Sequence, residues 1–149
     1  MKLPLSMVGI ATLTLAGCAT IVGGSRYNAS IHVPDHPKAK ISYERVYLGM
    51  GQTFFRVKRS KANSFSVLVE EEGCEAQTFN FTRRSFRGWA LAGTIVTWTG
   101  AYSGILIPWG VALDFSTGAL WKPDVQEKGV LKINYKNYFY ILEYKGCHD

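Results

Sequence analysis

The sequence has few side chains that bind metals or act as nucleophiles: its 149 residues include three cysteines and three histidines. No two cysteines are separated by two residues, so the paired-cysteine motifs of zinc sites and thioredoxin-type redox sites are missing. His32 and His36 flank a proline turn, and no carboxylate cluster stands at metal-ligand spacing. We therefore expect no metal site and no bound cofactor of this kind.

Motifs for catalysis are equally scarce. The chain has no Gly-x-Ser-x-Gly nucleophile elbow. Gly49-Met50-Gly51 lacks the third glycine of a dinucleotide-binding loop. The three carboxylates of residues 70–72 follow one another on one turn, where they face solvent more readily than they form an acid–base pair. No histidine is placed near Cys74 by sequence, so we expect no enzyme.

The N-terminus has the pattern of a secretory signal over residues 1–17. Lys2 supplies the positive charge, and an apolar stretch follows over residues 3–15, which is shorter than the ~20 residues of a membrane span. The stretch Leu15-Ala16-Gly17-Cys18 resembles the processing site of bacterial lipoproteins. This resemblance implies cleavage before Cys18, a diacylglycerol on its thiol and an acyl chain on the new amine. Two or more acyl chains hold a protein stably on a bilayer.

The same resemblance implies a location. Ala19 follows Cys18, where an acidic residue is associated with inner-membrane retention, so we expect an anchor in the outer membrane, facing the periplasm. The formal net charge of +6 suits anionic lipid or cell-wall polymer, although it also fits an ordinary solubility charge. An exported lipoprotein does not meet nucleic acid, so nucleic acid is excluded as a partner.

After a tether over residues 18–27, residues 28–83 contain short segments with alternating polar and apolar residues, separated by turns. This spacing predicts a small antiparallel β-sandwich. Eight apolar side chains are expected to face inward: Ile31, Ile41, Phe55, Val57, Val67, Val69, Phe79 and Phe81.

Residues 28–83 also resemble the PEGA-type domain of bacterial envelope proteins. The matching motifs are Val33-Pro34-Asp35-His36-Pro37, Ala39-Lys40-Ile41, Gly51-Gln52-Thr53-Phe54 and Glu72-Gly73-Cys74. Phe54 stands where the pattern has proline, and Cys74 where it has tyrosine. The resemblance implies an immunoglobulin-like interaction domain without catalytic residues.

Residues 84–123 differ in character, because residues 88–113 contain no charged side chain and follow the basic positions Arg83, Arg84 and Arg87. We expect two short helices folded at Pro108. Small residues at spacing four let such helices approach closely. The predicted membrane or partner contacts are Trp89, Trp98, Gly100, Gly104, Trp109 and Trp121.

Three environments are open for this hairpin: a lipid bilayer, a partner surface or second copy, and the core of the sandwich. Asp114 weighs against deep insertion of the second arm, because a carboxylate in hydrocarbon is costly. Gly88-Trp89 and the stretch from Asp114 to Pro123 are similar to a group of small bacterial lipoproteins that couple a PEGA-like sandwich to a Gly-rich apolar hairpin.

Residues 124–149 end the chain with two apolar or alternating stretches, and we expect one or two strands that return to the sandwich. If Cys18 carries lipid, Cys74 and Cys147 remain as a candidate disulfide in an oxidising periplasm.

Two functions are left open. The first is a membrane-anchored envelope lipoprotein with a structural, assembly or protein-interaction role. The second is a binder of cell-wall glycan or of a small envelope ligand. The aromatic residues suit either, because tyrosine and tryptophan are enriched at interfaces and also stack on sugars.

Overall fold

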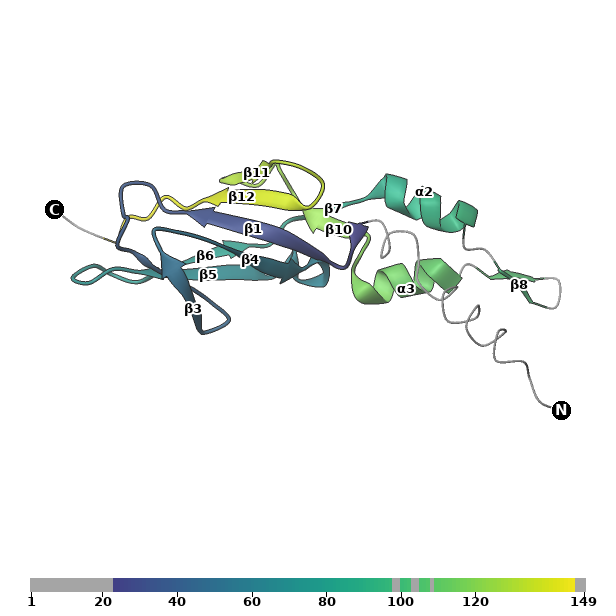
Figure 1. Ribbon diagram of the computed structural model, residues 1–149, viewed down its shortest axis with the longest axis horizontal. Coiled ribbons are helices and arrows are strands. Elements are labelled where there is room, and N and C mark those ends of the chain that lie inside the picture. The colour runs from purple at the N-terminus through teal and green to yellow at the C-terminus, as the bar shows by residue number, and fades with distance from the viewer. Residues whose placement is uncertain (1–22, 98–99, 103–104, 108, 147–149) are drawn as a thin grey trace.

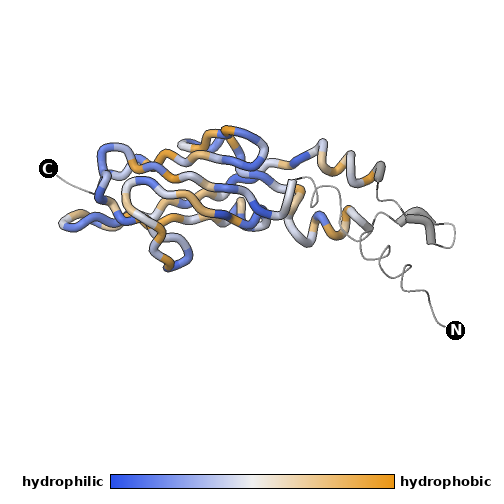
Figure 2. Tube along the Cα trace, viewed as in Figure 1, coloured by the Kyte–Doolittle hydropathy of each residue, from blue (hydrophilic) through white to orange (hydrophobic). Residues whose placement is uncertain are grey.

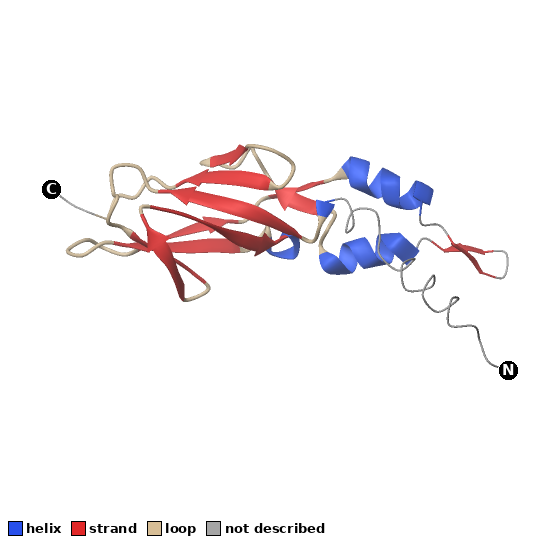
Figure 3. Cartoon of the chain, viewed as in Figure 1, coloured by secondary structure: helices blue, strands red, loops and turns tan. Residues whose placement is uncertain are grey.

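The computed structural model describes residues 23–97, 100–102, 105–107 and 109–146, and two four-stranded sheets form most of this part of the chain (Figures 1 and 3). The first sheet has the order β11-β12-β1-β4 and contains β1 (Arg26–His32), β4 (Gln52–Lys58), β11 (Val130–Lys132) and β12 (Asn137–Ile141). The second sheet has the order β3-β2-β5-β6 and contains β2 (Lys40–Tyr43), β3 (Val46–Met50), β5 (Phe65–Glu70) and β6 (Gln77–Phe81). The predicted fold class, a small β-sandwich with a helical insertion, is confirmed.

The C-terminal segment completes the first sheet. β11 and β12 form an antiparallel pair, and β12 lies parallel to β1 with Ile31 opposite Tyr140. All other strand pairs within the two sheets are antiparallel. Residues 28–83 therefore supply only β1 and β4 to this sheet, and the other half comes from the C-terminal strands β11 and β12.

The core lies between the sheets and follows the period of two that a strand imposes on its side chains. Of the side chains expected to face inward, Ile31, Ile41, Val57, Val67, Val69 and Phe81 are buried, while Phe55 and Phe79 are half-buried and pack against the cluster. Burial of each large apolar side chain contributes about 1.5–3 kcal/mol. Tyr27, Tyr138 and Tyr140 join the same core from β1 and β12.

One turn requires glycine. Gly51 separates β3 from β4 with a φ of 61°, a left-handed conformation that favours glycine. A Cβ atom at this position would lie 2.7 Å from the carbonyl oxygen of Pro37. The predicted proline turn after β1 and the glycine turn after β3 are thus packed against each other.

The inserted hairpin begins at β7 (Arg84–Phe86), which pairs with β10 (Trp121–Pro123) at its base. Between them come α2 (Gly88–Thr97), β8 (Gly100–Tyr102), β9 (Ile105–Ile107) and α3 (Trp109–Thr117). The helices contact each other and lie beyond one end of the sheets rather than over a face (Figure 1). Apolar positions recur along both helices (Figure 2).

The predicted fold-back at Pro108 was wrong, because the chain reverses between the antiparallel strands β8 and β9. Gly100 accordingly lies in β8 and not on a helix face, while Gly104 and Pro108 lie outside the described residues. The physical reason is local: tyrosine and isoleucine are enriched in strands, and Tyr102, Ile105 and Ile107 favour a β-hairpin over a continued helix.

Neither α2, α3 nor any other helix among the described residues is long and apolar enough to cross a membrane.

Candidate functional site at the junction of sandwich and hairpin

Arg59 connects three segments that are distant in the sequence. It follows β4 at the start of the short 3-10 helix η2 (Arg59–Lys61), and its side chain is completely buried. The guanidinium donates hydrogen bonds to three backbone carbonyls: Nε to Gly24 at 3.1 Å, Nη1 to Trp121 at 3.3 Å and Nη2 to Tyr135 at 3.0 Å. One side chain therefore holds together the N-terminal segment, the base of the hairpin and the turn before β12.

Backbone and aromatic contacts reinforce this position. The Arg59 amide donates to the Ser25 carbonyl at 2.8 Å, and its guanidinium lies 6.0 Å from the centre of the Tyr27 ring. Burial lowers the pKa of the Arg59 guanidinium, an effect that Tyr138 partly opposes. Hydrogen bonds from a charged donor each contribute about 1.5–3 kcal/mol, so the arrangement is strongly held.

Arg87 is the second buried cation of the junction, only 3% exposed. Its Nη1 donates to the Ala119 carbonyl at 2.6 Å, and its guanidinium lies 4.8 Å from the centre of the Trp89 ring. Burial, with a smaller contribution from Arg59, lowers the pKa of Arg87 to about 10. Nη2 has no hydrogen-bond partner among the described residues.

Gly23 lies directly on the Arg87 guanidinium, so that a side chain at this position would collide with Nη1 and Nη2. Gly24 is bound to Arg59. Gly23 and Gly24 therefore lie between the two buried arginines, at the base of the hairpin. Cys18 itself lies outside the described residues, five positions before Gly23.

The hairpin also contacts the sandwich at the turn between α3 and β10. Gly118, which follows α3 with a φ of 73°, lies against the backbone of Ser60 in η2, where a Cβ atom would approach the Ser60 nitrogen to 2.6 Å. The Arg87 amide donates to the Leu120 carbonyl at 2.8 Å. The returning arm of the hairpin thus meets the sandwich next to Arg59, and the outgoing arm is bonded to the returning one.

An aromatic cluster covers the outer side of the junction. Trp121 is half-buried, and the Arg84 guanidinium lies 3.9 Å from the centre of its ring. Phe86 and Phe115 contact the same ring edge-on, at centroid distances of 5.5 and 6.4 Å. Trp89 is 57% exposed.

The predicted contact residues fall on several elements. Trp89 and Trp121 belong to the junction, Gly100 begins β8 and Trp109 begins α3, while Trp98 and Gly104 lie outside the described residues. Sequence reasoning missed Arg59 and the N-terminal glycines, because no local pattern distinguishes a buried arginine from the solvent-exposed basic residues beside it. Of the two buried arginines, the sequence singled out Arg87 alone, as one of the basic residues that precede the uncharged stretch.

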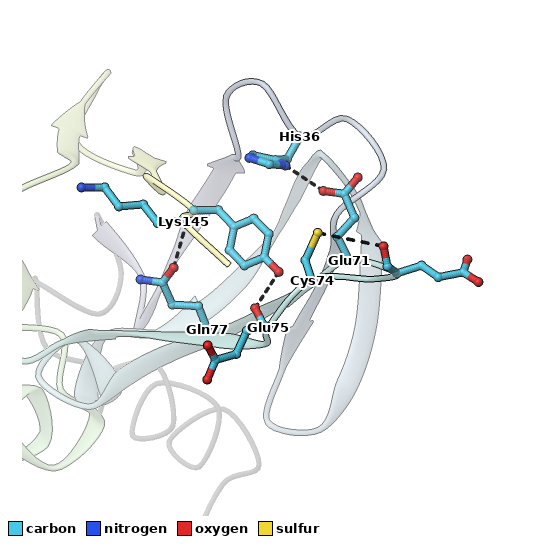
Figure 4. Close-up of polar contacts among 8 residues, drawn as sticks. His36, Glu71, Cys74, Glu75, Gln77 and Lys145 are labelled. Carbon is cyan, nitrogen blue, oxygen red and sulfur yellow. Dashed lines mark hydrogen bonds and ion pairs between the residues drawn. The ribbon is translucent and has the colours of Figure 1, made fainter. Parts of the chain in front are cut away.

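The other end of the sandwich contains Cys74, which is half-buried after β5 (Figure 4). His36 and Glu71 share a hydrogen bond nearby, with Nδ1 and Oε2 2.7 Å apart, a contact that their separation in sequence concealed. The Tyr144 hydroxyl donates to the Glu75 carbonyl at 2.7 Å, and the Glu75 amide donates to the Gly146 carbonyl at 2.8 Å. The next residue, Cys147, lies outside the described residues, so its pairing with Cys74 stays a prediction.

At the junction the buried guanidinium groups of Arg59 and Arg87 donate to backbone carbonyls and so hold segments of the chain together, while Trp89 and Phe115 present apolar surface to solvent. Among residues 23–97, 100–102, 105–107 and 109–146, no group of three or more His, Cys, Asp or Glu side chains is arranged to hold a metal ion. The resemblance to PEGA-type domains stays a prediction, because the chain matches no family model, no curated protein and no solved structure.

Proposed function

We propose that the protein is a bacterial envelope lipoprotein with a structural or protein-interaction role, anchored through Cys18 and holding its apolar hairpin at the membrane surface. One observation carries this proposal: residues 23–25 are bound by Arg59 and Arg87 at the base of the hairpin. The proposed lipid is therefore attached close to α2 and α3, and the sandwich extends away from it (Figure 1).

The length of the chain limits where the membrane can lie. Gly23 is five positions after Cys18, and a fully extended chain over these five steps spans at most about 18 Å. α2 has ten residues and extends about 15 Å from the same base. A lipid on Cys18 inserted in a bilayer would therefore bring the bilayer surface to the level of the hairpin.

The surface of the hairpin suits such a position. Trp89, Ile95 and Phe115 are 57%, 48% and 50% exposed, although all three are large and apolar. Asp114 is completely buried and accepts a hydrogen bond from Thr94. Its carboxylate is thus turned into the hairpin, which removes the objection that it would face lipid. Two short helices of this kind favour a position in the membrane interface over a span.

The anchor is tested by replacing Cys18. In a Gram-negative host, the native precursor should be cleaved, acylated and recovered with membranes, whereas Cys18→Ser should leave an uncleaved precursor without lipid. Fractionation measures recovery with membranes, and intact-mass measurement detects cleavage and acylation. A Cys18→Ser chain that is cut at the same bond and acylated as before would overturn the lipoprotein assignment.

Contact between the hairpin and the bilayer can be measured by intrinsic tryptophan fluorescence, because all four tryptophans lie within residues 89–121. Their fluorescence in the lipidated protein should be quenched by vesicles that contain brominated acyl chains. Fluorescence that these lipids leave unchanged would show that the hairpin does not touch the bilayer. A stable protein recovered with the lipidated chain in mild detergent would then identify the hairpin, or the sandwich, as a partner surface.

A second function, the binding of cell-wall glycan or of a small envelope ligand, is favoured by a hollow of about 590 Å³ beside β6. Phe79 and Phe81 line it together with Asn80, Lys128 and Glu143, a mixture of aromatic and polar groups that suits a sugar. Retention of the protein on isolated peptidoglycan, lost in Phe79→Ala, would support this alternative. Retention that is unchanged by Phe79→Ala would exclude this hollow as the binding site.

A further inference from the structure

We infer that the outer face of the first sheet binds the phosphate-bearing, anionic headgroups of membrane lipids at the end where the N-terminal segment enters. Four exposed cations form this surface, here termed the cationic patch: Arg26, Arg56, Lys58 and Lys136. The inference uses the proposed lipid anchor for its orientation, but its test does not require the anchor.

The strand register brings the cations together. In β1, Tyr27 and Ala29 point into the core, so Arg26 and Asn28 point outward. β4 pairs antiparallel with β1 and places Lys58 opposite Arg26 and Arg56 opposite Asn28. Residues directly opposite each other on one face lie about 5 Å apart, and like charges there are destabilising. A bound anion would relieve this repulsion.

Lys136 joins the patch from the other side of β1. Its carbonyl accepts a hydrogen bond from the Asn28 amide at 2.8 Å, which fixes the turn before β12 against the start of β1. The side chains of Asn28 and Asn137 are bonded at 2.6 Å between Nδ2 and Oδ1. The patch therefore rests on a rigid part of the sheet, not on a loose loop.

A hollow of about 320 Å³ lies within the patch. Arg26, Arg56 and Lys136 line it with Asn28, and its remaining wall is formed by residues 23–25 and Tyr27. No acidic side chain lines the hollow, and none of the four cations forms an ion pair with another described residue. A site with several cations and no carboxylate matches a phosphate group in charge and in hydrogen-bond donors.

The position of the hollow identifies the source of the phosphate. The same residues 23–25 that line the hollow are held at the hairpin base, so the hollow lies at the end of the sandwich that the proposed anchor turns toward the bilayer. Charges within a Debye length, about 8 Å at physiological salt, interact strongly with an anionic surface. Lipid headgroups are therefore favoured over the more distant polymers of the cell wall.

The test uses the chain from residue 18 with Cys18→Ser, which retains every described residue and carries no lipid. Its binding is measured by co-sedimentation with vesicles of neutral phosphatidylcholine and with vesicles that contain phosphatidylglycerol. We compare it with a patch variant, Arg26→Gln, Arg56→Gln and Lys136→Gln together. The matched control changes Lys38, Lys40 and Lys145 to Gln, exposed lysines near the opposite end, with the same loss of charge.

The unmodified chain should bind anionic vesicles more tightly than neutral ones, and the difference should shrink as salt is raised. The patch variant should lose affinity about tenfold or more, since each basic residue near an anionic surface contributes separately. The control should retain most of the binding. All three variant positions are exposed, so equal melting temperatures should show that the fold is intact.

Three results would overturn the inference: equal binding to both vesicle types, equal loss in the control, or no binding to vesicles at all. Inorganic phosphate separates the sources of the ligand. Tight binding of inorganic phosphate or of an anionic wall polymer at the patch, without vesicle binding, would assign the patch to that ligand instead. Failure of this test leaves the acylation of Cys18 untouched, because that is measured separately.

Discussion

Thr94 in α2 donates a hydrogen bond from Oγ1 to Oδ2 of Asp114 in α3 at 2.6 Å, and both side chains are completely buried. Oγ1 of Thr94 also lies 2.9 Å from the Ala90 carbonyl oxygen of its own helix, so its single hydroxyl proton is shared between two acceptors. This pair is a buried polar link between two helices that are rich in small and apolar residues. Hydrogen bonds to charged groups in a protein interior contribute more than those to neutral groups.

Thr94→Val should therefore loosen the hairpin while the sandwich stays folded. Loss of this donor to a buried carboxylate is expected to cost about 1–3 kcal/mol. Hydrogen exchange should accelerate at the amides of α2 and α3 and remain slow in β1 and β5. Ser116→Ala is the control, because the exposed Ser116 hydroxyl donates to the Leu113 carbonyl of its own helix. Unchanged exchange in Thr94→Val would show that the pair does not hold the helices together.

Phe65 is the aromatic centre of the sandwich. It is completely buried in β5, and its ring contacts Tyr140 of the opposite sheet at a centroid distance of 4.9 Å and Phe81 at 5.7 Å. Phe65→Ala should lower the free energy of unfolding by about 3–5 kcal/mol in urea denaturation. Phe54→Ala, at a site that is 79% exposed, should change it little. Similar losses for both would mean that the sheet faces are assigned wrongly.

The stability should fall at alkaline pH because two buried tyrosines resist ionisation. The hydroxyls of Tyr27 and Tyr140 lie 3.2 Å apart, and burial raises the pKa of both above the ordinary value. In the unfolded chain they titrate near pH 10. The contribution of these two tyrosines to the free energy of unfolding is thus fully present below about pH 10. It is lost as pH rises further, because only the unfolded state then releases these protons.

Urea midpoints measured across this range should decrease above about pH 10. Tyr140→Phe should flatten the decrease, although it also removes one hydrogen bond. Tyr47→Phe is the control, since Tyr47 is 55% exposed. A slope in Tyr140→Phe as steep as in the unmodified protein would exclude this tyrosine as a cause.

Cys74 and Cys147 should be oxidised together in protein taken from the periplasm. Gly146 and Glu75, each next to one of the cysteines, share a hydrogen bond of 2.8 Å, which brings the two chain segments together. A thiol count on denatured, unreduced protein should find neither thiol free, whereas Cys74→Ser should release one. A loop of this size makes the disulfide worth about 4 kcal/mol in the chain-entropy model. Two free thiols in the unmodified protein would show that Cys74 and Cys147 do not form a disulfide.

Much of the sandwich was predictable from local patterns. Val67 and Val69 alternate with polar residues in β5, and both are buried as that alternation requires. The hairpin was predictable as a separate insertion from its lack of charge. Its internal reversal was not, because a helix and a short β-hairpin compete for the same apolar residues around Gly100.

The sequence by itself determined the strand faces, the uncharged insertion and the predicted processing site at Cys18, because each depends on residues that are close together in the chain. Only the tertiary structure decided that β12 lies parallel beside β1 and that Arg59 meets carbonyls 35, 62 and 76 positions away. The same long-range packing set residues 23–25 at the base of the hairpin and Arg26 beside Lys136. The path of the chain between elements sets such contacts, and a local pattern contains no information about that path.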